Sequence, residues 1–207
     1  ALWNSIKVGV ITAIISTFIA LFAAKAFTRY RVKYSGLSYG ALLLPFIIPE
    51  IIIAVAFIVI WTSMGLKLGL IPITIAHILY CTPFCLLILI SRMDGFDKSL
   101  EEASMDLGEN IFGTFWRVTF PLLLPGIIAS LLLSFVISFD EFILAFFLSS
   151  SDQTLPIYMW SQLRFPKKLP HVLALGAIII VATSFIVMLS YWFRNLGQSN
   201  NNRGSHI

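Results

Sequence analysis

The chain has 207 residues, of which 58% are hydrophobic and 12% are charged, and its formal net charge is +4. Soluble domains are about 45–50% apolar and about 25% charged, so this composition, with a mean hydropathy of +0.93, excludes an ordinary soluble domain. The positive charge does not require a nucleic-acid partner, because basic residues that flank membrane helices account for it.

Five apolar stretches are long enough to cross a membrane. A bilayer core about 30 Å thick is crossed by roughly 20 apolar residues in a helix. Windows of that length predict an all-α, polytopic transmembrane helical bundle. The predicted spans are Ser5–Phe27, Gly40–Met64, Ile71–Ile90, Leu122–Phe147 and Val172–Phe193. The first is not a cleavable signal peptide, since it is long enough to span and has no small-residue cleavage site.

Lys and Arg residues are unevenly divided between the two ends of these spans. Nine of the fourteen flank the first loop, the acidic segment after Arg92 and the C-terminus, and the other five flank the opposite ends. Cytoplasmic loops carry the excess of Lys and Arg. We therefore expect the loop at Arg29, the acidic segment and the C-terminus to be cytoplasmic, and the N-terminus to lie outside.

The most polar stretch lies between the third and fourth spans, where residues 94–109 contain six of the ten acidic residues. Apolar residues at spacings of three and four predict one helical stripe: Leu100, Ala103, Leu107 and Ile111. Gly108 suits a turn into a second short helix. The apolar residues after it are expected to pack toward the membrane: Phe112, Phe115, Trp116 and Val118. The alternative, a loop lying on headgroups, is disfavoured because the cytoplasmic leaflet is negative.

Three acidic residues, Glu50, Asp140 and Glu141, fall inside predicted spans that contain no basic residue. A charge at the bilayer centre costs about 2.5–3.5 kcal/mol on insertion scales, so we expect these side chains to face a polar pathway that suits a cationic substrate. Adjacent residues point about 100° apart on a helix, so one of Asp140 and Glu141 is expected to line it. Pro45 and Pro49 are expected to interrupt the helix near Glu50. Alternatively, the acids pair with a partner subunit or cap broken helices.

Two common signatures of enzymes are absent from the sequence. It contains no Gly-Lys pair for a phosphate-binding loop and no H-E-x-x-H. Cys81 and Cys85 are one helical turn apart with His77 nearby, and we interpret the cysteines as small packing residues. The sequence therefore predicts a transport protein without catalytic residues or a metal site.

The acidic segment also carries a spaced motif. The pattern E-A-A, three residues, G, nine residues, I-x-L-P appears as Glu102-Ala103-Ser104, Gly108 and Val118-x-Phe120-Pro121, with every spacing kept. Ser104, Val118 and Phe120 replace Ala, Ile and Leu of the pattern. In this segment the chain resembles the permease subunits of bacterial binding-protein-dependent ABC importers, which have the type I permease fold.

The resemblance covers nearly the whole chain from Leu2. The stretch LWNSIKVGVITAIISTFIALFAAKAFTRYR looks like the family's opening helix with its basic exit. SRMDGFDKSLEEASMDLG and LLPGIIASLLLSFVISFDEFILAFFL look most like the spermidine/putrescine-type subfamily. In that subfamily an additional N-terminal helix usually precedes this point, which leaves the count of six helices open.

The resemblance implies one permease domain, residues 1–196, with a coupling segment at about 99–121 and a polar tail at 197–207 that ends in residues typical of a tag remnant. Its partners would be a second permease, two ATPase subunits that bind ATP and Mg²⁺, and an extracytoplasmic binding protein, all at the bacterial inner membrane. The residues that would engage the ATPase are Glu101, Glu102, Ala103, Ser104, Asp106, Leu107 and Gly108. ATPase closure would move this helix, and the span Leu122–Phe147 would tilt with it.

Polyamine import is therefore the predicted function, with the chain itself neither an enzyme nor a cofactor-binding protein. One alternative is a permease of the same fold for another solute, such as an anion or a metal chelate, which leaves Glu50, Asp140 and Glu141 unexplained. The other is a self-contained, proton-coupled carrier that uses these acids as a relay. Inverted repeats would support the carrier, and the sequence shows none.

Overall fold

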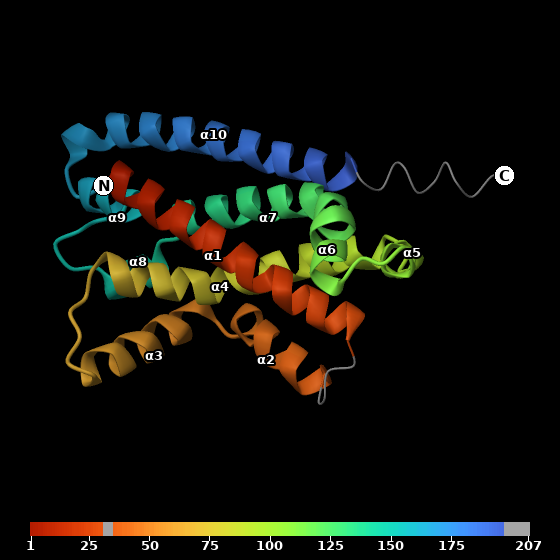
Figure 1. Ribbon diagram of the computed structural model, residues 1–207. Coiled ribbons are helices and arrows are strands. Elements are labelled where there is room, and N and C mark those ends of the chain that lie inside the picture. The colour runs from red at the N-terminus through yellow and green to blue at the C-terminus, as the bar shows by residue number, and fades with distance from the viewer. Residues whose placement is uncertain (31–34, 197–207) are drawn as a thin grey trace.

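The computed structural model describes residues 1–30 and 35–196, which form an all-helical bundle (Figure 1). The helices are α1 (Leu2–Arg29), α2 (Ser35–Ile47), α3 (Glu50–Ser63), α4 (Leu70–Asp94), α5 (Ser99–Asp106), α6 (Ile111–Thr114), the π-helix η1 (Phe115–Thr119), α7 (Phe120–Asp140), α8 (Ile143–Leu148), α9 (Leu155–Gln162), the 3₁₀-helix η2 (Pro166–Lys168) and α10 (Leu169–Leu196). The tail predicted at 197–207 lies outside the described residues.

Four helical runs are long and apolar enough to cross a membrane by themselves. They are Leu2–Arg29, Leu70–Asp94, Ile111–Asp140 and Pro166–Arg194. Helices α2 and α3 are long and apolar enough to cross a membrane only when they are taken together as one span. The chain bends by 102° between them. The predicted polytopic bundle is confirmed, with the second of the five predicted spans broken in its middle.

The bend between α2 and α3 has a local cause at Pro49. Proline has no backbone N–H and disfavours helical geometry in the residue before it, so α2 ends at Ile47 and α3 begins at Glu50. The predicted interruption near Glu50 is confirmed. Pro45 and Pro83, by contrast, remain inside α2 and α4.

The fourth predicted span, Leu122–Phe147, is wrong at its C-terminal end. α7 ends at Asp140, Glu141 has extended backbone geometry (φ −68°, ψ 125°), and α8 begins at Ile143. The carboxylate of Glu141 accepts hydrogen bonds from the backbone N–H groups of Leu144 (2.9 Å) and Ala145 (3.0 Å). An acidic side chain satisfies the first N–H groups of α8, which stabilises the break.

The core lies where α1, α4 and α7 pack against one another. Two buried clusters divide it along the bundle, one around Leu86, Leu89 and Leu123, and the other around Ile73 and Leu144. Buried alanines and serines on α1 permit close approach of the neighbouring backbones. α10 packs mainly on α7, and only 6% of its most apolar window is buried, against 50% for α4.

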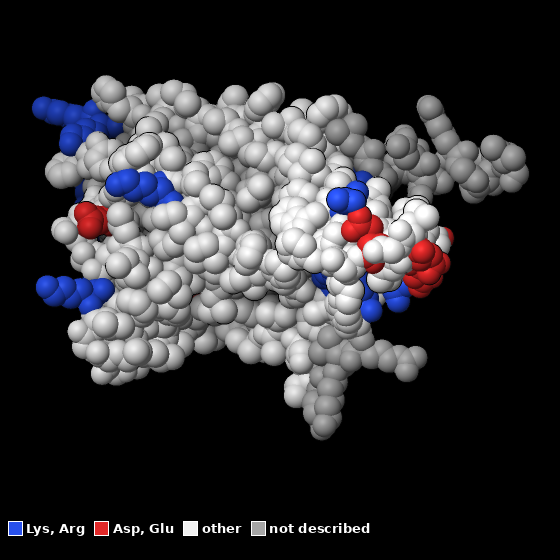
Figure 2. All heavy atoms as spheres, in the orientation of Figure 1, with Lys and Arg blue, Asp and Glu red and all other residues white. Residues whose placement is uncertain are grey.

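Charged side chains gather at the two ends of the molecule. Figure 2 shows Lys, Arg, Asp and Glu atoms at both ends of one face and a broad band without them in between. We call the end that carries α5 and α6 the α5 end, and the opposite end, which carries α9, the α9 end (Figure 1). An uncharged band between two charged rims is the surface expected of a membrane-spanning bundle.

Candidate functional site

The segment between α4 and α7 forms the predicted helix, turn and second helix. At its start, the carboxylate of Asp97 accepts a hydrogen bond from the backbone N–H of Ser99 at 3.0 Å, and this bond lowers the pKa of Asp97. Gly108 in the turn has φ of 94°, which strongly favours glycine. Asn110 caps α6 by accepting from the N–H of Gly113 at 2.7 Å.

The outer face of α5 and its turn exposes both apolar and acidic groups. Leu107 is 88% exposed, and Ile111 and Leu100 are also exposed. Three more of the predicted coupling residues lie on the surface with them: Glu102, Ala103 and Asp106. The stripe predicted from helical spacing therefore faces away from the bundle. Clustered exposed apolar residues with a polar rim mark a surface that contacts either another protein or a membrane.

The remaining predicted coupling residues with side chains, Glu101 and Ser104, face inward. Ser104 Oγ lies 3.1 Å from Thr114 Oγ1. Glu101 Oε2 lies 2.8 Å from Nε of Arg29, at the end of α1, and Glu101 Oε1 accepts from the hydroxyl of Thr119 at 2.5 Å. The sequence places Arg29 in the basic flank of α1 but does not indicate its acidic partner. The two are 72 positions apart, and no local spacing relates them.

The apolar run after Gly108 is divided between the interior of the bundle and its surface. Phe115 is buried and Val118 partly buried, whereas Phe112 and Trp116 are exposed. Phe115 belongs to the π-helix η1, which lies directly before α7. This run therefore continues the exposed surface of α5 along one side while anchoring α7 through the other.

A second polar group lies inside the bundle, where two chain breaks meet. Glu50 begins α3 after the proline bend, and its carboxyl group lies within hydrogen-bonding reach of that of Glu141, at the break between α7 and α8. His77 of α4 joins them: its Nε2 is 3.0 Å from Oε2 of Glu141, and its Nδ1 is 2.8 Å from Oγ of Ser138. We call Glu50, His77, Ser138 and Glu141 the buried polar cluster.

The two carboxyl groups of this cluster have different surroundings. Glu141 is buried and binds two backbone N–H groups as well as His77. Glu50 is half-buried, and no Lys, Arg or His of the described residues forms an ion pair with it. Two carboxylates in contact repel each other, so a cation beside Glu50 would be stabilised.

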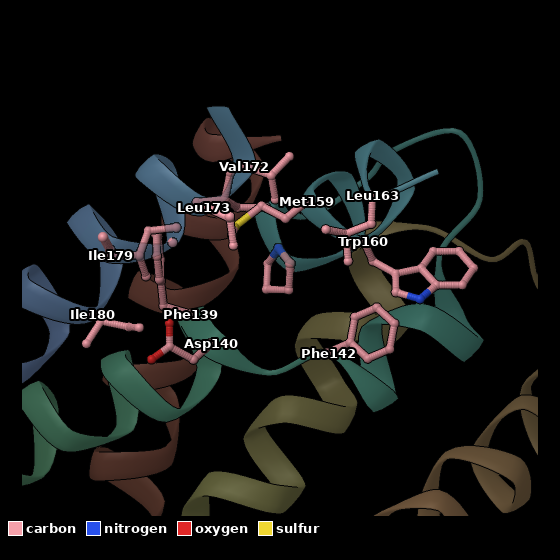
Figure 3. Close-up of a pocket in the computed structure, with 14 residues that line it drawn as sticks. Phe139, Asp140, Phe142, Met159, Trp160, Leu163, Val172, Leu173, Ile179 and Ile180 are labelled. Carbon is pink, nitrogen blue, oxygen red and sulfur yellow. The ribbon is translucent and has the colours of Figure 1, made fainter. Parts of the chain in front are cut away.

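Asp140, the third predicted acid, lies apart from this cluster. Its side chain is exposed and lines a cavity of about 630 Å³ between the end of α7, α9 and α10. In Figure 3, Asp140 lies beside Phe139 at the end of α7, and Trp160 and Phe142 lie across the cavity. The structure thus brings Glu50 and Glu141 together and separates them from Asp140.

His77 is the member of the cluster that sequence reasoning missed. In the sequence His77 lies near Cys81, and the spans that contain the acids hold no basic residue, so neither pattern points to α4 as the source of a partner. The available signal was a single histidine within an apolar span. Within the described ranges, no three His, Cys, Asp or Glu residues lie close enough together to hold a metal ion.

Comparison with known proteins decides the family. Residues 16–198 match the family described as the binding-protein-dependent transport system inner membrane component. The chain belongs to this family. It is a multi-pass inner-membrane permease of the ABC importer type, and its all-helical fold and exposed α5 segment fit that membership.

The permease is similar to curated relatives along most of its length. It is 31% identical over 188 residues to the spermidine/putrescine transport system permease protein PotC of Haemophilus influenzae, covering 90% of this chain and 73% of the relative. The PotC protein of Escherichia coli is 30% identical, with 90% and 71% covered. The putrescine transport system permease protein PotI of Escherichia coli is 26% identical, with 91% and 69% covered. The predicted family resemblance is confirmed.

Proposed function

We propose that this permease takes up polyamines, delivered by an extracytoplasmic binding protein and driven by ATP hydrolysis in partner subunits. The observation that carries the proposal is Glu50, a half-buried carboxyl group in the apolar band that has no cationic partner among the described residues. Ionisable groups within membrane-spanning segments mark substrate paths. The similarity to permeases named for spermidine and putrescine supports the same substrate class.

Glu50 would contact the substrate directly. It lies at the bend between α2 and α3, where the interrupted backbone leaves carbonyl groups free to face the same path. Glu141 would add negative charge beside it while His77 holds its carboxylate. Asp140 would act separately, as an acidic group at the cavity between α9 and α10.

The α5 segment would engage the ATPase subunit in the cytoplasm. Its outer face carries Leu107 and Glu102, which would fill a groove of the partner and form charge-assisted hydrogen bonds. ATP and Mg²⁺ would bind in the ATPase, and closure of two ATPase subunits would move α5 and the connected α7. Residues 1–196 would form a single permease domain that pairs with a second permease.

Uptake by the complete transporter tests this proposal. The chain is reconstituted with its partner permease, ATPase subunits and binding protein in proteoliposomes, and uptake of radiolabelled spermidine and putrescine is measured with and without ATP. ATP-dependent uptake that falls when unlabelled amines compete supports the proposal. Uptake driven by a pH gradient without ATP would instead support the proton-coupled carrier. Lack of competition by any amine would indicate a permease for another solute.

A further inference from the structure

Arg29 lies at a junction of four segments at the α5 end. Its Nε is 2.8 Å from Glu101 of α5, and its Nη2 donates to the backbone carbonyl of Met93 near the end of α4 at 3.3 Å. Its guanidinium also lies 4.6 Å from the ring centre of Phe96, in the connection between α4 and α5. One side chain of α1 therefore contacts α4, the following connection and α5.

Glu101 extends this junction to α7. While one carboxylate oxygen pairs with Arg29, the other accepts from Thr119, the last residue of η1. The residue after Thr119 begins α7. The carboxylate thus joins α5 to the end of α1 and to the start of α7, and π-helical segments such as η1 are frequent at functional sites.

The pair is shielded from water, unlike the other Arg–Glu pair of this segment. The side chains of Arg29 and Glu101 are 10% and 12% exposed, whereas those of Arg117 and Glu109 are 74% and 29% exposed. Ion pairs that are exposed to solvent contribute little to stability. Removing one partner of a shielded pair leaves an uncompensated charge and strongly disturbs the contact.

We propose that Arg29, through Glu101, is the positioning residue that transmits movement of α5 to α1. This inference rests on the proposed function, in which an ATPase moves α5. The chain itself joins α5 to α4 through residues 95–98 and to α7 through α6 and η1. The Arg29–Glu101 contact adds a path into α1, which packs on both α4 and α7. The three helices then move together when α5 moves.

The first test measures coupling in the complete reconstituted transporter. Arg29→Gln should lower substrate uptake per ATP hydrolysed at least fivefold, while assembly with the ATPase persists. Arg117→Gln is the matched control, since it removes an arginine from the exposed pair of the same segment, and it should keep the wild-type ratio. If Arg29→Gln impairs assembly, Thr119→Val removes the second contact of Glu101 without a charge change, and it should lower the ratio in the same direction.

A cross-link provides the decisive test. Arg29→Cys and Glu101→Cys are combined and joined by a short bifunctional thiol reagent; the native Cys81 and Cys85 are 0% and 1% exposed and should not react. The unlinked double variant should be uncoupled, and linking should restore at least half of the wild-type ratio. Wild-type protein treated with the reagent serves as the control. If the linked transporter remains uncoupled or no longer takes up substrate, the inference is overturned, because the contact would not transmit movement of α5.

Two other results would also overturn the role of Arg29. One leaves the proposed function intact, and the other rejects it as well. An uptake-to-ATP ratio in Arg29→Gln and Thr119→Val equal to that of Arg117→Gln would reject the role of Arg29 alone, with the proposed function intact. A wild-type chain that does not copurify with an ATPase, or whose uptake needs no ATP, would reject the proposed function and this inference together.

Discussion

Nε2 of His77, on α4, lies 3.0 Å from Oε2 of Glu141, at the break between α7 and α8, and the two side chains are 1% and 4% exposed. This contact fixes the break to the core of the bundle. Because Glu141 also binds two N–H groups of α8, its carboxylate is already satisfied. The carboxyl group of Glu50 beside it has no such partners among the described residues. Substrate binding and stability should therefore change differently when Glu50 and Glu141 are neutralised.

Glu50→Gln should weaken substrate binding without weakening the fold. Glutamine keeps the size of the side chain and removes the negative charge that a cationic substrate would contact. We expect KM for spermidine uptake to rise roughly tenfold, which corresponds to about 1.4 kcal/mol, with the ratio of uptake to ATP hydrolysis at saturation little changed. Uptake by proteoliposomes over a range of spermidine concentrations measures both quantities.

Asp152→Asn is the control for this change, because Asp152 is an exposed acid in the connection between α8 and α9, away from the buried polar cluster. It should leave KM within twofold of wild type.

The combined variant Asp140→Asn and Glu141→Gln should also lower uptake of a polycation while assembly persists. Wild-type KM in Glu50→Gln together with wild-type uptake in the combined variant would exclude these acids from the pathway.

His77→Ala should destabilise the permease itself. It leaves the buried carboxylate of Glu141 without its contact to Nε2 of His77, and a buried polar group that loses a partner costs roughly 1–3 kcal/mol. The apparent melting temperature in detergent should fall by several degrees. His171→Ala, at an exposed position near the start of α10, should leave it unchanged. Equal melting temperatures for the two variants would show that the His77–Glu141 contact does not stabilise the fold.

The limits of sequence reasoning are visible in this cluster. Apolar length predicts the spans, and proline chemistry predicts the bend at Pro49, because both depend on neighbouring residues. The position of the break at Glu141 was not predicted, because it is stabilised by a side chain that folds onto the next helix. The alternative that these acids cap broken helices does apply to Glu141. The pairing of Glu141 with His77 joins positions 64 apart, and it follows from the packing of α4 on α7 and α8 rather than from any spacing.

The same distinction applies to the α5 segment. The turn at Gly108 and the apolar stripe around Leu107 follow from local patterns, and the structure contains both; the exposure of that stripe is visible only in the structure. The division of two adjacent acids, with Glu101 inward and Glu102 outward, requires knowledge of where Arg29 ends α1. Helical spacing alone placed both acids on the flanks of the stripe, without deciding which one faces the bundle.

The start of α5 should respond to acid through Asp97. The hydrogen bond from the Ser99 N–H lowers the pKa of Asp97 below its ordinary value of 3.8, so the folded form binds the proton less tightly. This contribution is present above pH 3.8 and is lost as the pH falls through the lowered value. Amide-exchange protection of Ser99, corrected for intrinsic exchange, should decrease over that range.

Asp97→Asn keeps a side-chain acceptor without the titrating group. Protection of the Ser99 amide in this variant should therefore be independent of pH below 3.8. A decrease as large in Asp97→Asn as in wild type would mean that other groups at the α5 end cause the acid response.

Gly108→Val should uncouple the transporter by distorting the turn after α5. The φ of 94° at Gly108 is unfavourable for any residue with a Cβ and most of all for a β-branched one. No neighbouring atom lies within 4 Å of a Cβ added there, so the effect would come from backbone strain and not from a clash. We expect uptake per ATP hydrolysed to fall at least tenfold. Gly65→Val is the matched control, because Gly65 has φ of 72° and equally open surroundings. It belongs to the connection between α3 and α4, which lies at the α9 end (Figure 1). This variant should cost similar stability and leave coupling intact. Undiminished uptake in Gly108→Val, or equal uncoupling in both variants, would contradict a specific role for the α5 turn.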